Sequence, residues 1–206
     1  DANTTGTYNV AVGHQALGTN ITTSSNTAVG YAALKVNVAA NNTAVGKDAL
    51  LANTTGTPNV AVGRGALNAN TTGGGNTAVG DIALGNNTTA SSNTAVGRNC
   101  LNVNTTGAQN TAIGDSALFR NTTANDNVAV GYYTLDHNTT GANNTAVGSS
   151  ALTANTTGEA NVAIGASALP ANTTGSTNVA IGKALDANTT GGNNIGIGYA
   201  ALNANT

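Results

Sequence analysis

Large aromatic and charged side chains are scarce in this sequence of 206 residues. It has no Trp, no Met and a single Phe, Phe119, and its charged residues make up only 7%, whereas soluble domains average roughly a quarter. The net charge of -2 offers neither the basic patch of a nucleic-acid-binding protein nor a cationic face for a membrane surface. Apolar runs are only a few residues long, so we expect no membrane insertion.

Residues that could form a catalytic or metal site are equally few. Cys100 is the only cysteine, which excludes an intrachain disulfide and a multi-cysteine metal site. His14 and His137 lie far apart with no Ser or Cys placed to act with them, so we interpret both as surface residues. The acidic residues are scattered, unlike the regular Asp of calcium-binding β-rolls, and Gly73-Gly74-Gly75 lacks the Lys-Ser/Thr of a phosphate-binding loop. We therefore predict no enzyme activity, metal or cofactor.

A short repeat fills the chain instead. The motif Asn-Thr/Val-Ala-Val/Ile-Gly occurs eleven times, and a twelfth copy at residues 194–198 reads Asn-Ile-Gly-Ile-Gly; the copies are 17 residues apart except for two intervals of 16. A fixed short period indicates stacked units, none of which can bury a core alone. The Asn of each copy falls at residues 9, 26, 42, 59, 76, 93, 110, 127, 144, 161, 178 and 194.

The full unit reads Asn-(Thr/Val)-Ala-(Val/Ile)-Gly-x-x-Ala-Leu-x-x-Asn-Thr-Thr-Gly-x-x, and we number its positions one to seventeen. β-Branched residues at positions two and four favour an extended strand. The Gly at position five, which occurs in every copy, indicates a positive φ or a close backbone approach. The Leu at position nine suggests a second short strand, and Asn-Thr-Thr-Gly a closing turn, with stacked Asn side chains able to form a ladder.

We therefore predict an all-β protein, a parallel β-solenoid (β-roll) of about twelve 17-residue coils. At about 4.8 Å per coil, the rod would be roughly 55–60 Å long. Residues 1–206 form one repeat array with no internal domain boundary. Both ends fall inside a repeat, whereas natural arrays end in atypical caps, so we expect a segment of a longer fibrous protein.

The direction in which the strand residues point is open between two alternatives. We expect positions two and four to face inward, so that Val62 packs with Leu67 and Val79 with Leu84, and the Ala of position three to face outward. A strip of small apolar side chains would then suit a parallel homotrimer, with an interface that contains Ala78, Ala95, Ala112, Ala146 and Ala163. In the alternative, Ala faces inward and leaves files of Thr and Val outside.

The frequent Thr residues suggest two other uses, N-glycosylation and ice binding. Asn-Thr-Thr matches the N-glycosylation sequon, but we interpret it as the turn of each coil. Ice-binding solenoids carry Thr-x-Thr, which places both hydroxyls on one face of a strand. Here the two Thr are adjacent and position two alternates between Thr and Val, which makes ice binding the weaker alternative.

The copies at residues 161–165 and 178–182, both Asn-Val-Ala-Ile-Gly, resemble the head repeats of trimeric autotransporter adhesins. That resemblance implies a left-handed parallel β-roll, three chains around one axis, and binding to a host-surface protein or glycan. Similar arrays occur in phage tail fibres and in bacterial surface proteins. The resemblance leads us to expect an extracellular structural or adhesive fibre segment on a cell or virion surface. A phage tail-fibre shaft is the nearest alternative, and the sequence identifies no ligand-binding residue.

Overall fold

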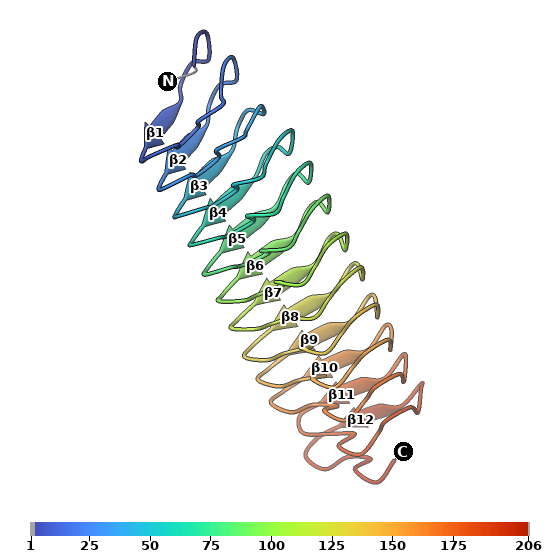
Figure 1. Ribbon diagram of the computed structural model, residues 1–206. Coiled ribbons are helices and arrows are strands. Elements are labelled where there is room, and N and C mark those ends of the chain that lie inside the picture. Colours follow the sequence, from blue (N-terminus) through green and yellow to red (C-terminus); the bar gives the residue numbers. More distant parts are fainter. Residues whose placement is uncertain (1–2, 206) are drawn as a thin grey trace.

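The computed structural model describes residues 3–205, which form a long stack of coils with one strand in each coil (Figure 1). The twelve strands make one parallel sheet in which each strand pairs with the next one in the sequence. This confirms the predicted all-β parallel solenoid with a period of about 17 residues. The hand of the coil stays a prediction, and Asp1, Ala2 and Thr206 of the predicted array lie outside the described residues.

Each strand covers positions two to four of the unit. The pairing keeps these positions in register, so that Ala stacks on Ala along the sheet. The two shortened units keep the register as well, because their missing residues lie in the turns. The strands β1 to β12 are Val10–Val12, Thr27–Val29, Thr43–Val45, Val60–Val62, Thr77–Val79, Thr94–Val96, Thr111–Ile113, Val128–Val130, Thr145–Val147, Val162–Ile164, Val179–Ile181 and Ile195–Ile197.

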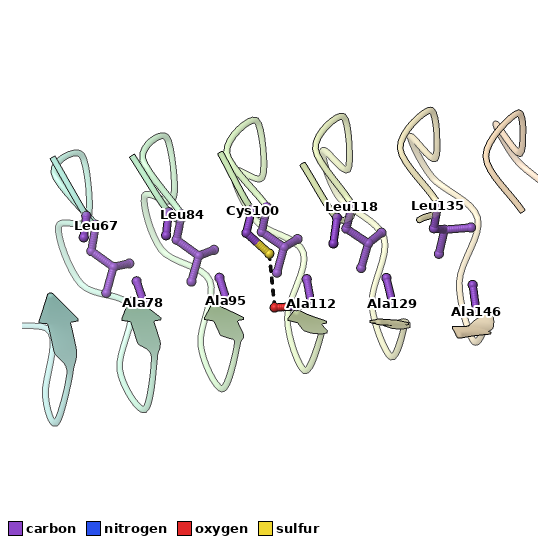
Figure 2. Close-up of a cluster of buried hydrophobic side chains, with 14 of the residues drawn as sticks. Leu67, Ala78, Leu84, Ala95, Cys100, Ala112, Leu118, Ala129, Leu135 and Ala146 are labelled. Carbon is purple, nitrogen blue, oxygen red and sulfur yellow. Dashed lines mark hydrogen bonds between the residues drawn. The ribbon is translucent and has the colours of Figure 1, made fainter. Parts of the chain in front are cut away.

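The core lies between the strand and the turn that follows it. Leu of position nine is fully buried in the ten coils from Leu34 to Leu185, as predicted, and Ala of position eight packs beside it. Figure 2 shows the Leu side chains pointing toward the Ala of position three on the opposite wall. Since a buried Leu contributes about 1.5–3 kcal/mol, these side chains supply most of the apolar stabilisation of each coil.

The expected orientation of the strand is wrong. The Ala of position three, represented by Ala78, Ala95, Ala112, Ala146 and Ala163, is 0% exposed within a single chain. Leu already fills the space between the two walls, which leaves room for only a methyl group on the strand side. Since side chains alternate along a strand, positions two and four must then face out, as the burial pattern of β6 shows.

The wall that contains Leu is a series of turns and not the predicted second strand. Its backbone is left-handed at two positions in most coils: Leu84 has a φ of 51° and Ile82, at position seven, a φ of 55°. A left-handed conformation costs an L-residue roughly 1–2 kcal/mol. The burial of Leu offsets that cost at position nine, whereas the side chain of Ile82 at position seven is only partly buried.

Two files of buried asparagines fasten the coils to one another. At position one, the main-chain N–H of Asn93 donates to Oδ1 of Asn76 in the preceding coil at 3.0 Å. At position twelve, Nδ2 of Asn87 donates to Oδ1 of Asn70 at 2.8 Å. The amides of Asn76 and Asn87 also both donate to the carbonyl of Ala90 within their own coil. The predicted Asn ladder is therefore present twice.

The glycine of position five is required for two reasons. Gly80 has a φ of 140°, and a Cβ added to it would lie 2.4 Å from the carbonyl oxygen of Gly97 in the next coil. Any other residue would be strained and would also separate the coils. The prediction from the repeat, a positive φ or a close approach, is confirmed on both counts.

Candidate functional site

Three surfaces run along the rod, and they differ in composition. The sheet face, formed by the outward side chains of positions two and four, contains only Thr, Val and Ile. The threonine edge, formed by positions thirteen and fourteen, is Thr-Thr in nine successive coils from Thr54 to Thr190. The variable edge, formed by positions six, seven, ten and eleven, carries all six basic residues of the chain: Lys35, Lys47, Arg64, Arg98, Arg120 and Lys183. The chemistry of the variable edge changes from coil to coil, and so does that of the turn at positions sixteen and seventeen, which ranges from Thr57-Pro58 to Glu159-Ala160.

The two positions of the threonine edge differ in their contacts: position thirteen bonds to the next coil, and position fourteen is exposed to solvent. The hydroxyl of Thr71 donates to the carbonyl of Thr88 in the next coil at 3.0 Å, and the same bond repeats along the file. The Thr of position fourteen is exposed. The sequon asparagines beside it are fully buried, and the amide of Asn87 already donates two hydrogen bonds. The interpretation of Asn-Thr-Thr as the turn is therefore consistent with the structure, since glycosylation of Asn87 would break the ladder.

Side chains at position six contact their equivalents in the next coil. The rings of His14 and Tyr31 stack with centroids 5.5 Å apart. Farther along the edge, Arg98 donates to the carboxylate of Asp115 at 2.8 Å, and this hydrogen bond lowers the pKa of Asp115 below its ordinary value. Such exposed ion pairs contribute about 0–1 kcal/mol each, so they order the edge without holding the stack together.

One pocket interrupts the regular surface of the variable edge. It has a volume of about 210 Å³ and lies where positions seven, ten and eleven of the coils that contain β6, β7 and β8 meet. Its lining combines two aromatic rings, a guanidinium group, a carboxylate, an amide and a hydroxyl, from Phe119, Tyr133, Arg120, Asp136, Asn99 and Ser116. The 17-residue register brings these residues together, since Phe119 and Asp136 occupy position ten of successive coils.

Asp136 is the only buried charged residue within residues 3–205, at 4% exposed. Its Oδ2 lies 3.2 Å from Nδ1 of His137 and 3.9 Å from Nε of Arg120, whereas its Oδ1 has no hydrogen-bond partner. Burial raises the pKa of Asp136, and the nearby His137 and Arg120 only partly oppose this. A buried acceptor without a donor costs about 1–3 kcal/mol, so the pocket is built around an unsatisfied group.

The other residues considered from the sequence do not form a site. His14 and His137 lie in the first and eighth coils, and no group of three His, Cys, Asp or Glu within residues 3–205 could hold a metal ion. Cys100 is buried at position eight, where its thiol donates to the carbonyl of Ala112 at 3.1 Å (Figure 2). Burial raises the pKa of Cys100 to about 12, so the thiol stays protonated. The alanines proposed as an interface lie in the core and form no surface.

A second cavity, of about 310 Å³, opens at the N-terminal end of the stack. It is lined by core residues of the first coil, among them Ala11 and Leu17, so it is the uncovered end of the core. In the part of the chain that the structure describes, no helix is long and apolar enough to cross a membrane. Comparison with family models, with curated proteins and with solved structures found no match to this chain.

Proposed function

We propose that this chain is a rigid segment of an extracellular adhesive fibre, with its binding residues on the variable edge. One observation carries the proposal: the constant residues of the unit hold the coils together, and the varying ones lie in the turns, with all six basic residues on the variable edge. Asn76, Gly80 and Leu84 hold their coil to its neighbours, whereas positions six and seven range from Tyr132-Tyr133 to Ser149-Ser150. Loops on a rigid repeat scaffold are where such proteins bind partners. The resemblance to adhesin heads and tail fibres supports the same role.

Self-association is part of this proposal, with a different surface from the one expected. The sheet face is flat and uncharged, and on it Val96 and Ile113 are 36% and 40% exposed. Three chains packed through their sheet faces around a long axis would bury these side chains in a closed assembly. The variable edge would stay accessible in such a homotrimer, because it lies on the turn that follows the strand.

Ice binding is a second candidate function, and the outward direction of positions two and four favours it. Thr94 and Val96 both face out, and the sheet face carries Thr at position two in six of the twelve coils, with Val or Ile in the others. These hydroxyls lie on the sheet itself, so this use does not depend on the adjacent threonines of the turn. A homotrimer would cover the same surface, so the two uses of the sheet face exclude each other.

The adhesive fibre can be tested by length and by binding. Duplicating residues 76–92 should lengthen the rod by about 4.8 Å for each added coil, which small-angle scattering measures. Replacing Tyr132 and Tyr133 by Ser, the residues of the next coil, should weaken binding of the chain to intact cells, with Val128→Thr on the sheet face as the control. A rod that does not lengthen contradicts the stacked fibre, and equal binding by all variants contradicts the variable edge.

Light scattering and thermal hysteresis separate the two uses of the sheet face. We expect the mass of three chains and no hysteresis. The mass of one chain together with ice shaping would instead assign the sheet face to ice. Thr94→Lys should then abolish the hysteresis, because a charged side chain breaks the flat neutral array, whereas Ser149→Lys on the variable edge should leave it intact.

A further inference from the structure

We propose that the pocket between the coils of β6, β7 and β8 binds one neutral sugar ring. The proposal refines the adhesive role of the variable edge and rests on that role, since it names the ligand class for one place along it. In this pocket the surface of the solenoid departs from its regular pairing, because a buried carboxylate oxygen has no hydrogen-bond partner. It contains the only Phe of the chain and, among residues 3–205, the only buried charged side chain.

The carboxylate of Asp136 defines what the ligand must supply. An ionised carboxylate only accepts hydrogen bonds. Oδ1 is buried without a donor, so a ligand meets the carboxylate through Oδ2, which lies 3.2 Å from Nδ1 of His137 and accepts no hydrogen bond among residues 3–205. Asn99, on the same lining, makes no side-chain hydrogen bond among the described residues, so its amide can both donate and accept. A ligand with adjacent hydroxyl groups satisfies both, because each hydroxyl donates one hydrogen bond and accepts others.

The aromatic rings of Phe119 and Tyr133 supply the other half of the recognition. Ligand pockets combine apolar and aromatic surface with a few polar groups that fix orientation. A pyranose ring has the matching chemistry, with C–H groups on its faces and hydroxyls around its rim. The volume of about 210 Å³ is below the range of roughly 300–1,000 Å³ typical of drug-sized ligands, so the pocket suits one ring with the remainder in solvent.

Charge selects a neutral ligand. The lining carries one cation, Arg120, and one buried anion, Asp136, with His137 beside the carboxylate. An ammonium group would meet Arg120, and an acidic sugar would meet Asp136 with no surplus of positive charge to compensate. Arg98 and Asp115, which lie in the same coils as the pocket, already form an ion pair with each other. A polyhydroxylated ring without charge meets neither penalty.

The repeat provides substitutions that are compatible with the fold. Asp136→Asn and Phe119→Asn introduce the residue that position ten already has at Asn68 and Asn102, and Tyr133→Ser introduces the residue of position seven at Ser150. Asp186→Asn is the matched control, because Asp186 also occupies position ten but faces Lys183 at 3.8 Å on the exposed surface.

The test is an NMR titration of the full chain with the methyl glycosides of glucose, galactose and mannose, followed by a glycan array. At least one glycoside should bind saturably, and Asp136→Asn and Phe119→Asn should each weaken it about tenfold, the effect of losing roughly 1.4 kcal/mol. Asp186→Asn should bind like the parent. Array binding to glycans that end in the same sugar identifies a surface glycan as the source, and titration without array binding identifies the free sugar.

Three results would overturn the proposal: no saturable shift with any neutral glycoside, tighter binding of methylammonium or of sialic acid, or equal losses in Asp186→Asn and Asp136→Asn. The rod itself is tested separately by scattering and by cell binding. If sugar binding fails while the parent still adheres to cells, the pocket is not the site but the adhesive fibre stands. If adhesion and lengthening both fail, the fibre proposal fails.

Discussion

The sheet face and the variable edge are made by the same units, yet they tolerate change very differently. The sheet face accepts only Thr, Val or Ile at positions two and four, whereas the variable edge accepts Lys, Asp, Tyr, Gly and Pro. The first lies on the parallel ladder, where β-branched residues suit the extended backbone. The second lies on turns whose side chains point to solvent. The comparison shows that this scaffold confines sequence variation to the turns of each coil, on the variable edge and at positions sixteen and seventeen.

Asparagine shows the same contrast within a single residue type, between buried and surface positions of the unit. Asparagines at positions one and twelve are buried and bonded to the neighbouring coils, so each is tied to a fixed geometry. Asn68, at position ten of the variable edge, has the same chemistry but no such role, and its equivalents are Gly85 and Phe119 in other coils. Constancy within the repeat therefore follows the bonds between coils and not the type of residue.

Leu84→Asp should have the largest effect of any single change. It removes a fully buried side chain and places a charge in the core, which together should cost at least about 4 kcal/mol. Urea denaturation should show loss of stability, and hydrogen exchange should rise first in the coils on either side of β5. Leu51→Asp, on the partly buried variable edge, should be nearly neutral because Asp186 occupies the same position at the surface. Equal stability of Leu84→Asp and the parent would contradict the core assignment.

Asn93→Ala should have the next largest effect. It leaves the buried main-chain N–H of Asn110 without its acceptor and removes one of the two amide donors to the carbonyl of Gly107, which keeps Asn104, at a cost of about 1–3 kcal/mol. Asn68→Ala should change stability by less than about 0.5 kcal/mol, because no side-chain hydrogen bond is lost. The measurement is the free energy of unfolding in urea for both variants. Similar values for the two would show that the ladder does not stabilise the stack.

Most of the fold follows from the sequence, because it depends on features that repeat. The period predicts one coil per unit, and the residues found in every copy at positions five and nine predict a constrained glycine and a buried Leu. The direction of the strand does not follow from hydrophobicity alone, because the apolar Val of position two exchanges with Thr in half of the copies. Constant Asn and Ala at positions one and three, with Thr/Val exchange between them, indicate the inward side more reliably.

The turns and the pocket were harder to predict. Leu is an unfavourable residue for a left-handed backbone, so nothing local suggests that Leu84 has a positive φ. The pocket depends on three coils in register, and no motif contains it. Its signal was the spacing of 17 between Phe119 and Asp136, the positions at which a large aromatic ring and a carboxylate replace the usual small residues. A comparison of each position along the stack would have placed them side by side.

Asp136→Asn should have a smaller effect that depends on pH. Because burial raises the pKa of Asp136 above the ordinary value of 3.8, the folded state binds this proton more tightly than the unfolded state does. The parent therefore loses stability from this group as the pH rises through the raised pKa, and it regains that stability on acidification. The Asn variant should be the more stable protein at pH 7, and the difference should shrink toward pH 4. A parent that is more stable at pH 7 would show that His137 and Arg120 outweigh the burial.

The smallest expected effect compares the two surfaces directly. Replacing Ile by Asn should stabilise the protein on the variable edge and destabilise it on the sheet face. Ile82 is a β-branched residue at a φ of 55° on the variable edge, where Asn99 stands in the next coil. Ile82→Asn should raise the free energy of unfolding by about 0.5–1 kcal/mol, since Asn adopts the left-handed backbone more readily. Ile113→Asn, on the sheet face in β7, relieves no strain and should lower stability by a similar amount, because Asn is a poor strand residue. Thermal and urea unfolding of the two variants measures both signs, and a loss in Ile82→Asn would mean that the contacts of the Ile side chain outweigh its backbone strain.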